Sequence, residues 1–400
     1  MKNWLTRISG KKLIILETKN RKNNFKYTHY SITSAMENLK THGFILIDVD
    51  VAALNNAGKS ETTQADNGVA TKKIRKNGRT YTYVSGQAWR FWWRNTLQKQ
   101  LNWTLSPVVR ADKVAFTSAN PIEYPDDDIF GYMKAAKDVQ LDESGQAVLD
   151  KKGKEVKENV TVTRVSPLKN SAIIAVTSIQ TVENFSVMAR QDGDPVPYTK
   201  EEYSAIMKGM FSLDLAMVGT FASYNKTGFK NLSVVLREDA IKNGATELAD
   251  PHMVDAKGEP HKLVRMDRET RVKRAVETIQ ALKYISGGAM QTNNLADVSP
   301  KFIVLATTTS GNHPFSHIVQ STGEYDHAFM LNCHGLTEVL TEFAGQIQGK
   351  VFIGVRSGFL SDYYTEELKK ALDSFGEKVV FTSVHQAIDG YVEQLKAQMP

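Results

Sequence analysis

The sequence has one cysteine and no long apolar segment, and each scarcity excludes a class of protein. Cys333 stands alone, which rules out an intramolecular disulfide and gives no indication of a cysteine-based metal site. No apolar run approaches the roughly 18 residues that span a membrane. The basic N-terminus has only a short apolar stretch, at residues 13–16, whereas a secretory signal needs about 7 to 15 such residues. We therefore expect a protein of the reducing cytoplasm without membrane contact.

Acidic residues are scarce in the first quarter of the chain. Residues 1–110 hold 19 Lys and Arg against 6 Asp and Glu, whereas the remaining 290 residues hold 31 against 38. The net charge of +6 hides this asymmetry. An excess of cations in one region favours a face that binds a polyanion, although solvated surface lysines would give the same count.

Recognisable catalytic motifs are also missing. The chain has no G-x-S-x-G elbow and no credible nucleophile–base pair for acyl transfer. Three adjacent carboxylates at Asp126, Asp127 and Asp128 could hold Mg²⁺ for phosphodiester cleavage, but neighbours in sequence do not easily converge on one ion, so we expect a solvated turn. His313 and His317 lie four apart without an evident third ligand, which argues against zinc.

One segment approaches a phosphate-binding loop. Residues 53–60 read A-x-x-x-x-G-K-S and follow an expected strand, one residue short of the pattern G-x-x-x-x-G-K-[ST]. The first glycine is replaced by Ala53, and the polar residues after Ser60 do not favour the helix that such a loop must open. Nucleotide binding through Lys59 is therefore a minor alternative.

The order of the expected elements indicates an α+β fold. Residues 42–53 alternate apolar and polar residues as a strand does, and residues 302–307 form another apolar run. Residues 85–101 and 268–285 have helical periodicity. After Thr337, helices and strands alternate regularly. Residues 111–163 have weak apolar patterning and are expected to form a projecting insertion, and the turn sequence Asp-Gly-Asp-Pro at residues 192–195 predicts a second projecting hairpin.

The segment YVSGQAWRFWWRNTLQKQL carries the strongest local pattern. Ser85 is a good N-cap directly after an expected strand. Trp89, Trp93 and Leu97 recur at i, i+4 and i+8, so they share one helix face and are expected to enter the core.

A neighbouring face of this helix is basic and polar. Gln87, Arg90 and Arg94 lie three and four residues apart, and residues 71–79 upstream add five cations. Because a helix N-terminus offers free N–H groups and the positive end of the helix dipole, this arrangement predicts a phosphate-binding surface. An amphipathic helix with solvated arginines is the alternative.

A glycine-rich loop follows the second expected helix. The residues SGGAMQ at 286–291 are small enough for a backbone to approach a phosphate closely. A plain helix C-cap would use the same residues.

Several segments together resemble a known family. They are DVDVAALNNAGKS at 48–60, YVSGQAWRFWWR at 83–94, DIFGYM at 128–133, TRVSPLKNSAIIAV at 163–176, FSLDLAMVGTF at 211–221 and SGGAMQTNNLADVSP at 286–300. In their order and spacing they are similar to the DevR-like type I-B branch of the CRISPR Cascade backbone subunit, within the RAMP superfamily of crRNA-binding proteins.

The resemblance implies a fold with named parts. Members have a modified RNA-recognition-motif (ferredoxin-like) palm, finger-like insertions and a thumb hairpin. Here the palm would comprise residues 1–110, 164–182 and 208–400, with a finger-like insertion at 111–163 and the thumb at 183–207. The chain has no ordinary aromatic string of an RNA-recognition motif, so base stacking on the sheet is not expected.

It also implies a function. The subunit would polymerise head to tail along crRNA and present the guide for pairing with a target DNA strand, beside other Cascade subunits, without catalysis and without a cofactor. The predicted RNA contacts are Asn55, Asn56, Lys59, Ser85, Gln87, Arg90, Arg94, Gly288, Ala289 and Gln291. Phe185 or Met188 would be the wedge beside a flipped base. The alternative is a metal-dependent ribonuclease of the type III kind that uses one of the three aspartates at 126–128.

Overall fold

The computed structural model describes residues 38–59, 68–111, 114–140, 146–190, 192–226, 230–322 and 329–400. The helices in these ranges are α1 (Gly86–Leu101), α2 (Pro125–Phe130), α3 (Val234–Lys242), α4 (Arg268–Gln280), α5 (Gln291–Asn294), α6 (Cys333–Glu342), α7 (Asp362–Asp373) and α8 (Val384–Gln398). None of them is long and apolar enough to cross a membrane.

Strands of the main sheet come from the whole length of the described chain. They are β1 (Lys40–Ala52), β2 (Asn56–Lys59), β3 (Val69–Thr71), β4 (Lys73–Lys76), β5 (Arg79–Val84), β10 (Leu168–Asn170), β11 (Ile173–Ala175), β12 (Val182–Met188), β13 (Val196–Asp214), β17 (Phe302–Thr308), β20 (Ile347–Val355) and β21 (Val379–Thr382). The principal order is β21-β20-β17-β1-β13-β11-β5-β4.

The centre of this sheet has a split β-α-β topology. β17, β1, β13 and β11 are neighbours and pair antiparallel. In sequence, α1 lies between β1 and β11, and α4 lies between β13 and β17, which is the β-α-β-β-α-β order of a ferredoxin-like unit. The predicted α+β class is confirmed. The designation of this unit as an RNA-recognition-motif palm stays a prediction, which the strand order supports.

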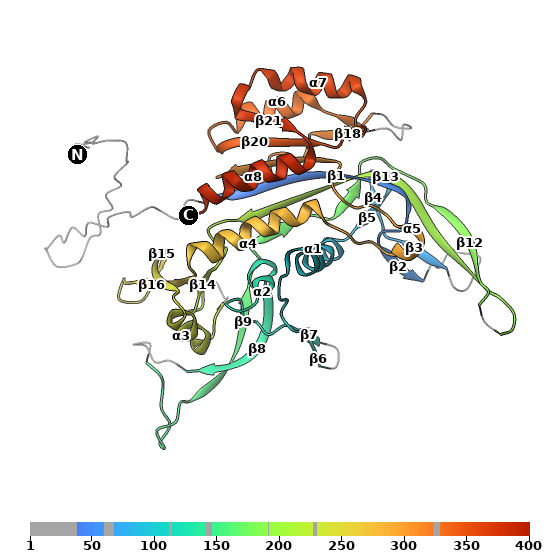
Figure 1. Cartoon of the computed structure of the whole chain (residues 1–400). Coiled ribbons are helices and arrows are strands. Elements are labelled where there is room, and N and C mark those ends of the chain that lie inside the picture. Colours follow the sequence, from blue (N-terminus) through green and yellow to red (C-terminus); the bar gives the residue numbers. More distant parts are fainter. Residues whose placement is uncertain are drawn as a thin grey trace. The chain divides into compact units, whose positions relative to one another are not determined.

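Helices cover both faces of the central strands. Trp89 and Trp93 of α1 pack with Ile279 of α4 and Tyr391 of α8 in one core. A second core joins Phe44 of β1 to α6 and α7 on the opposite face, and Figure 1 shows these two helices on the far side of the sheet from α4 and α8. Since β1 is covered on both sides, its first eight residues are all buried, as expected for a central strand.

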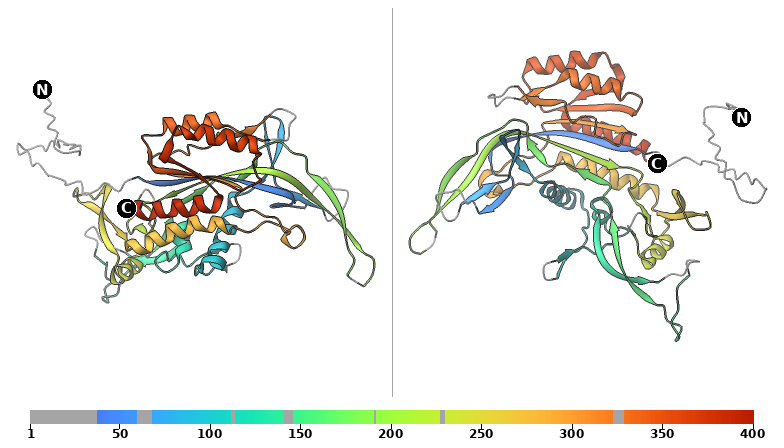
Figure 2. Two further views of the ribbon diagram at one scale, coloured as in Figure 1. Left: turned by 45° about the horizontal axis from the view of Figure 1, so that its top comes forward. Right: turned by 180° about the vertical axis from the view of Figure 1, so that it is seen from behind.

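Two long hairpins extend from this body (Figure 2). One is formed by β8 (Tyr132–Val139) and β9 (Lys157–Arg164), and all of it except its last residue falls in the predicted insertion at 111–163. The other is formed by β12 and β13. β13 runs unbroken through residue 207, so the predicted end of the thumb falls inside one continuous strand. The assignment of these hairpins as finger and thumb stays a prediction.

Smaller sheets complete the described structure. β14 (Thr220–Ala222), β16 (Pro260–Arg265) and β15 (Thr246–Val254) form a three-stranded sheet, and two further pairs are β6 (Val109–Ala111) with β7 (Val114–Phe116) and β18 (Val319–Ser321) with β19 (Phe329–Leu331). Sequence periodicity did not predict the three-stranded sheet, because its strands carry little alternation of burial.

Candidate nucleic-acid interface

The N-terminus of α1 lies against two loops that are distant from each other in sequence. The backbone N–H of Ser85 donates to Oδ1 of Asn55 at 2.8 Å. The backbone N–H of Ala289 donates to the carbonyl of Leu54 at 2.9 Å. The structure therefore brings together the three predicted RNA-contact segments, which are the loop after β1, the start of α1 and the glycine-rich loop.

Ser85 caps α1 as its sequence position predicts. Its Oγ accepts the N–H of Ala88 at 3.3 Å, and its carbonyl accepts the N–H of Trp89 at 3.1 Å. The N–H groups of Gly86 and Gln87 are among those that a helix cannot satisfy itself. The side chain of Gln87 is exposed beside them. Such a helix start attracts anions through its free donors and its dipole.

The glycine-rich loop requires its glycines. A Cβ at Gly287 would lie 2.3 Å from the ring of Trp92, and Gly288 has a φ of +114°, which L side chains rarely adopt. Nε2 of Gln291 donates to the carbonyl of Gly287 and, at 3.2 Å, to that of Ala296. The amide of Gln291 therefore shapes the loop from within, and the close approach of loop and helix depends on the absent side chains.

Residues 56–59 form a strand, which contradicts the nucleotide-binding alternative. β2 pairs antiparallel with β3, with Asn56 opposite Thr71 and Lys59 opposite Val69. A phosphate-binding loop of the Walker type must open a helix at this point. Asn56 itself is exposed, the side chain of Lys59 lies outside the described part of the structure, and so does Ser60.

Arg90 is bound within the protein. Nη1 donates to the carbonyl of Leu168 at 2.7 Å and to Oδ1 of Asn170 at 3.1 Å, while Nη2 donates to the carbonyl of Phe130 at 2.6 Å and to Oγ of Ser166 at 3.0 Å. Burial, with a smaller contribution from neighbouring Arg94, lowers the pKa of Arg90 to about 10. With four of its five N–H donors used internally, its direct contact with RNA stays a prediction, and its observed contacts are structural.

Arg94 is half-buried and paired. Its Nη2 lies 2.7 Å from Oδ2 of Asp126, whose other oxygen accepts the backbone N–H of Ser106 at 2.8 Å. Burial raises the pKa of Asp126 despite these partners. Nε of Arg94 is buried without a partner among the described residues. Nη2 therefore holds α2 against α1, whereas Nη1 has no hydrogen-bond partner among the described residues and keeps its donor capacity.

The three adjacent aspartates are buried, so the prediction of a solvated turn is wrong. Asp126 is 2% exposed, and Asp127 and Asp128 are 0% exposed. They form the first turn of α2, where carboxylates are favoured by the helix dipole. No group of His, Cys, Asp or Glu in the described ranges is arranged to hold a metal ion.

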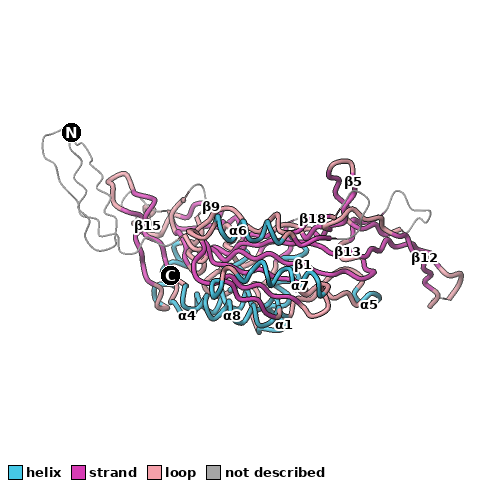
Figure 3. The backbone as a smooth tube through the Cα atoms, turned by 90° about the horizontal axis from the view of Figure 1, so that it is seen from above, coloured by secondary structure: helices cyan, strands magenta, loops and turns pink. Residues whose placement is uncertain are grey.

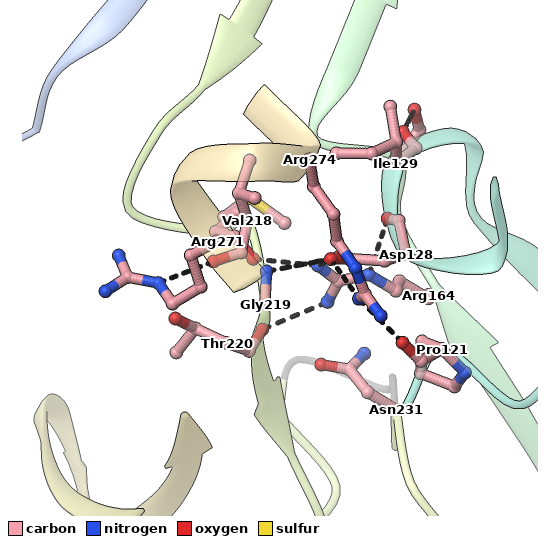
Figure 4. Close-up of polar contacts among 12 residues, drawn as sticks. Pro121, Asp128, Ile129, Arg164, Val218, Gly219, Thr220, Asn231, Arg271 and Arg274 are labelled. Carbon is pink, nitrogen blue, oxygen red and sulfur yellow. Dashed lines mark hydrogen bonds and ion pairs between the residues drawn. The ribbon is translucent and has the colours of Figure 1, made fainter. Parts of the chain in front are cut away.

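Asp128 is the centre of a buried ion cluster (Figure 4). One oxygen pairs with Nη2 of Arg164, and the other lies 2.7 Å from Nη1 of Arg274 and accepts the backbone N–H of Gly219 at 2.9 Å. These partners come from β9, α4 and the turn before β14. The cluster therefore joins three parts of the fold, and its carboxylate is closed to a substrate.

The two candidate wedge residues lie on opposite faces of the β12–β13 hairpin. Phe185 is opposite Thr199, and Met188 is opposite Val196. Side chains alternate along a strand, so positions three apart point to different sides. Both are exposed, Phe185 at 68% and Met188 at 51%. Only one of them can therefore act as a wedge toward a given base.

The end of the β12–β13 hairpin nearest the main sheet is hydrogen-bonded to α5, which directly follows the glycine-rich loop. The sequence did not predict this contact. The carboxylate of Glu202 accepts from Lys200 at 2.6 Å, Asn184 at 2.5 Å and Asn294 of α5 at 2.9 Å. Burial alone would raise the pKa of Glu202, but these hydrogen bonds lower it. No local sequence pattern predicts such a contact, because the partners of Glu202 are up to 92 residues away in sequence.

Comparison with known proteins gives one family. The sequence model described as "CRISPR-associated negative auto-regulator DevR/Csa2" matches residues 45–327, which is more than half of the chain. No curated protein matches the chain. Two solved structures described as "CRISPR RNA-guided surveillance complex" and "CRISPR RNA-guided surveillance complex, pre-nicking" are similar at 11% identity, with TM-scores of 0.44 and 0.45, over 89% of this chain and 99% of those chains.

Proposed function

We propose, on the premise that the chain belongs to the CRISPR-associated DevR/Csa2 family, that it is a crRNA-binding backbone subunit of a type I Cascade complex. It polymerises along the guide RNA and presents the bases for pairing with target DNA in antiviral defence. Base pairing reads the sequence in this arrangement, and the protein reads the RNA backbone, a division of labour known from RNA-guided recognition in general.

The observation that carries this proposal is the convergence of three segments at the start of α1. The loop after β1, which carries the exposed Asn56, is hydrogen-bonded through Asn55 to Ser85 directly before the helix and through Leu54 to Ala289 of the glycine-rich loop. This loop therefore connects the helix start, with the N–H groups of Gly86 and Gln87, to the tight turn at Gly288. Every one of these groups is a donor or permits close approach, and none carries a negative charge. The arrangement suits a phosphate and reads no base, which a subunit that tolerates any guide sequence requires.

The predicted contacts divide into two roles. Residues with free donors or an accessible backbone are proposed to contact phosphate directly: Asn56, Gln87, Arg94 and Gly288. Residues whose side-chain or backbone polar atoms are already hydrogen-bonded within the protein, as donor or acceptor, are proposed to position them: Asn55, Ser85, Arg90, Ala289 and Gln291. Lys59 stays a predicted phosphate contact.

The β12–β13 hairpin is proposed as the thumb. An exposed aromatic ring stacks on any base, so Phe185 is the better wedge than Met188. Head-to-tail contacts between identical subunits give open filaments when their rotation does not close. The proposed partners are crRNA, the target DNA strand, further copies of the chain and other Cascade subunits.

A charge placed at the helix start tests the phosphate site. Gln87→Glu puts a carboxylate where an anion is expected, at an exposed position where the helix dipole favours it. The fold is therefore retained, while RNA binding weakens by about fivefold or more, because two like charges about 4 Å apart repel by about 1 kcal/mol even in bulk water. Fluorescence anisotropy with a labelled single-stranded RNA at several salt concentrations measures the effect.

The matched control is Gln98→Glu. Gln98 is exposed on the same helix, and eleven residues place it nearly on the same side, about 16 Å further along the axis. That separation exceeds the screening length of about 8 Å at physiological salt. Equal weakening by both variants would mean that only net charge matters and that the helix start is not the phosphate site.

No observation favours the ribonuclease alternative over this proposal. The aspartates on which it depends are buried, and Asp128 is paired with Arg164 and Arg274. We propose that the subunit is not itself a nuclease; Mg²⁺-dependent cleavage of complementary RNA by the purified chain would contradict this.

A further inference from the structure

One end of the main sheet has a face that no helix of the described chain covers. Lys208 of β13 pairs with Ile174 of β11, which pairs with Tyr83 of β5. Tyr81 of β5 pairs in turn with Ile74 of β4. Directly paired residues share a face, so these side chains form one row across four strands, about 14 Å long. We call it the β4–β5 face.

This face is opposite to α1. Val84, Ile173 and Met207, the neighbours of Tyr83, Ile174 and Lys208 along their strands, lie in the core that contains α1. Alternation along a strand therefore turns the β4–β5 face to the side of α6 and α7.

The helices α6 and α7 do not extend over the side chains of the β4–β5 face. Ile206 and Met210 of β13 pack against the α6–α7 core, whereas Tyr81, Tyr83 and Ile74 belong to neither core. Figure 3 shows β5 extending beyond α6 and α7. Ile74 is 45% exposed, and both tyrosines are half-buried.

Two lysines on the β4–β5 face, Lys76 and Lys208, have no carboxylate partner among the described residues. Lys76 of β4 is exposed, and Nζ of Lys208 contacts only the carbonyl of Ser316, at 3.3 Å, among the described residues. Burial and then repulsion from Lys76 lower the pKa of Lys208. The surrounding sequence, residues 67–111, holds nine Lys and Arg and no Asp or Glu.

We propose that the β4–β5 face binds a segment of single-stranded nucleic acid separate from the strand at α1. Aromatic rings with unpaired cations are the composition of sequence-tolerant single-strand sites, in which bases stack on rings and phosphates meet lysines. Tyr81 and Tyr83 supply the rings, and Lys76 and Lys208 supply the charge. The strand is separate because the start of α1 lies on the other side of the sheet.

This proposal goes beyond the proposed function and is tested on the full chain. The protein is first saturated with an unlabelled RNA of defined length. A labelled, non-complementary oligonucleotide, either oligo-dT or oligo-U, is then titrated and followed by anisotropy. Binding of oligo-dT, of oligo-U or of both supports a second site and tells whether its strand is DNA, RNA or either. Displacement of the first RNA, or no binding of either probe, overturns it.

Two substitutions locate the second site. Tyr81→Ala is expected to weaken binding of the second oligonucleotide about tenfold, since loss of one stacked ring weakens binding by about 5- to 150-fold. Lys76→Gln is expected to make log K fall less steeply with log salt. The magnitude of the slope should decrease by about 0.7, the value for one phosphate contact on a single strand. The matched controls are Tyr363→Ala and Lys369→Gln on α7, both at exposed positions. Equal effects of test and control variants overturn the assignment.

A measurement on the unmodified protein guards against misfolded variants. An oligonucleotide that carries 5-bromouracil is cross-linked by light to the RNA-saturated chain, and the linked peptide is identified by mass spectrometry. Links to Tyr81 or Tyr83 support the β4–β5 face; links only to α1, to β12 or to no peptide overturn it. Gln87→Glu separates the two claims, because it weakens the first RNA and leaves these links unchanged.

Discussion

Replacing Asp128 by Asn is expected to destabilise the whole fold. The substitution keeps the shape of the side chain but removes the negative charge that faces Arg164 and Arg274, whose side chains are 1% and 6% exposed. Breaking a buried ion pair by removing one partner costs about 3–5 kcal/mol, because the remaining charge is left uncompensated. Since folded domains are stable by only about 5–15 kcal/mol, this is a large share.

Urea unfolding followed by tryptophan fluorescence measures the loss. With a denaturant slope of about 3 kcal/mol per molar, the midpoint falls by roughly 1 M or more. The control is Asp389→Asn, which removes an ion pair with Lys283 at 2.7 Å, but at a carboxylate that is 52% exposed; exposed pairs contribute about 0–1 kcal/mol. If Asp128→Asn unfolds at the same urea concentration as Asp389→Asn, the cluster does not hold the fold together.

Three further predictions concern single side chains. Burial lowers the pKa of His313 from 6.5 to about 4, so the unfolded chain takes up this proton at a higher pH than the folded chain does. The free energy of unfolding is therefore expected to fall by up to about 3 kcal/mol as the pH drops from 6.5 to 4. In melting curves, His313→Gln should flatten this pH dependence, whereas the control His385→Gln, at an exposed position, should not. Arg90→Ala is expected to lower the melting temperature by several degrees, because it leaves the buried carbonyls that Arg90 binds without a hydrogen-bond donor. An unchanged melting temperature with weakened RNA binding would instead show that Arg90 contacts RNA directly. Phe185→Ala is expected to weaken RNA binding and to change the spacing of nuclease protection, and Met188→Ala to do neither, because the two lie on opposite faces of the hairpin; equal effects would refute the assignment of one wedge.

Local rules predicted the elements around the candidate site. Ser85 is the N-cap of α1 in the structure, as its position directly after an expected strand predicts. Trp89 and Trp93 are fully buried because their spacing places them on one face of α1. Such features depend on residues within a few positions of one another, which a single sequence records.

Contacts between distant segments could not be predicted in this way. Asp128 looked like part of a solvated turn, because its partners Arg164 and Arg274 are 36 and 146 residues away. The β4–β5 hairpin could have been predicted from the dipeptide Asn77-Gly78. Asn-Gly is the strongest short-range signal of a two-residue hairpin turn, and both residues have the positive φ that such a turn requires. The β4–β5 face, in contrast, can be identified only once the order of the strands in the sheet is known.

Native mass spectrometry of the chain with RNAs of increasing length tests the central claim most directly. A backbone subunit that grips phosphates is expected to bind in copies whose number rises by regular steps with RNA length, whatever the RNA sequence. One copy at every length, or binding that depends on one particular sequence, would contradict it.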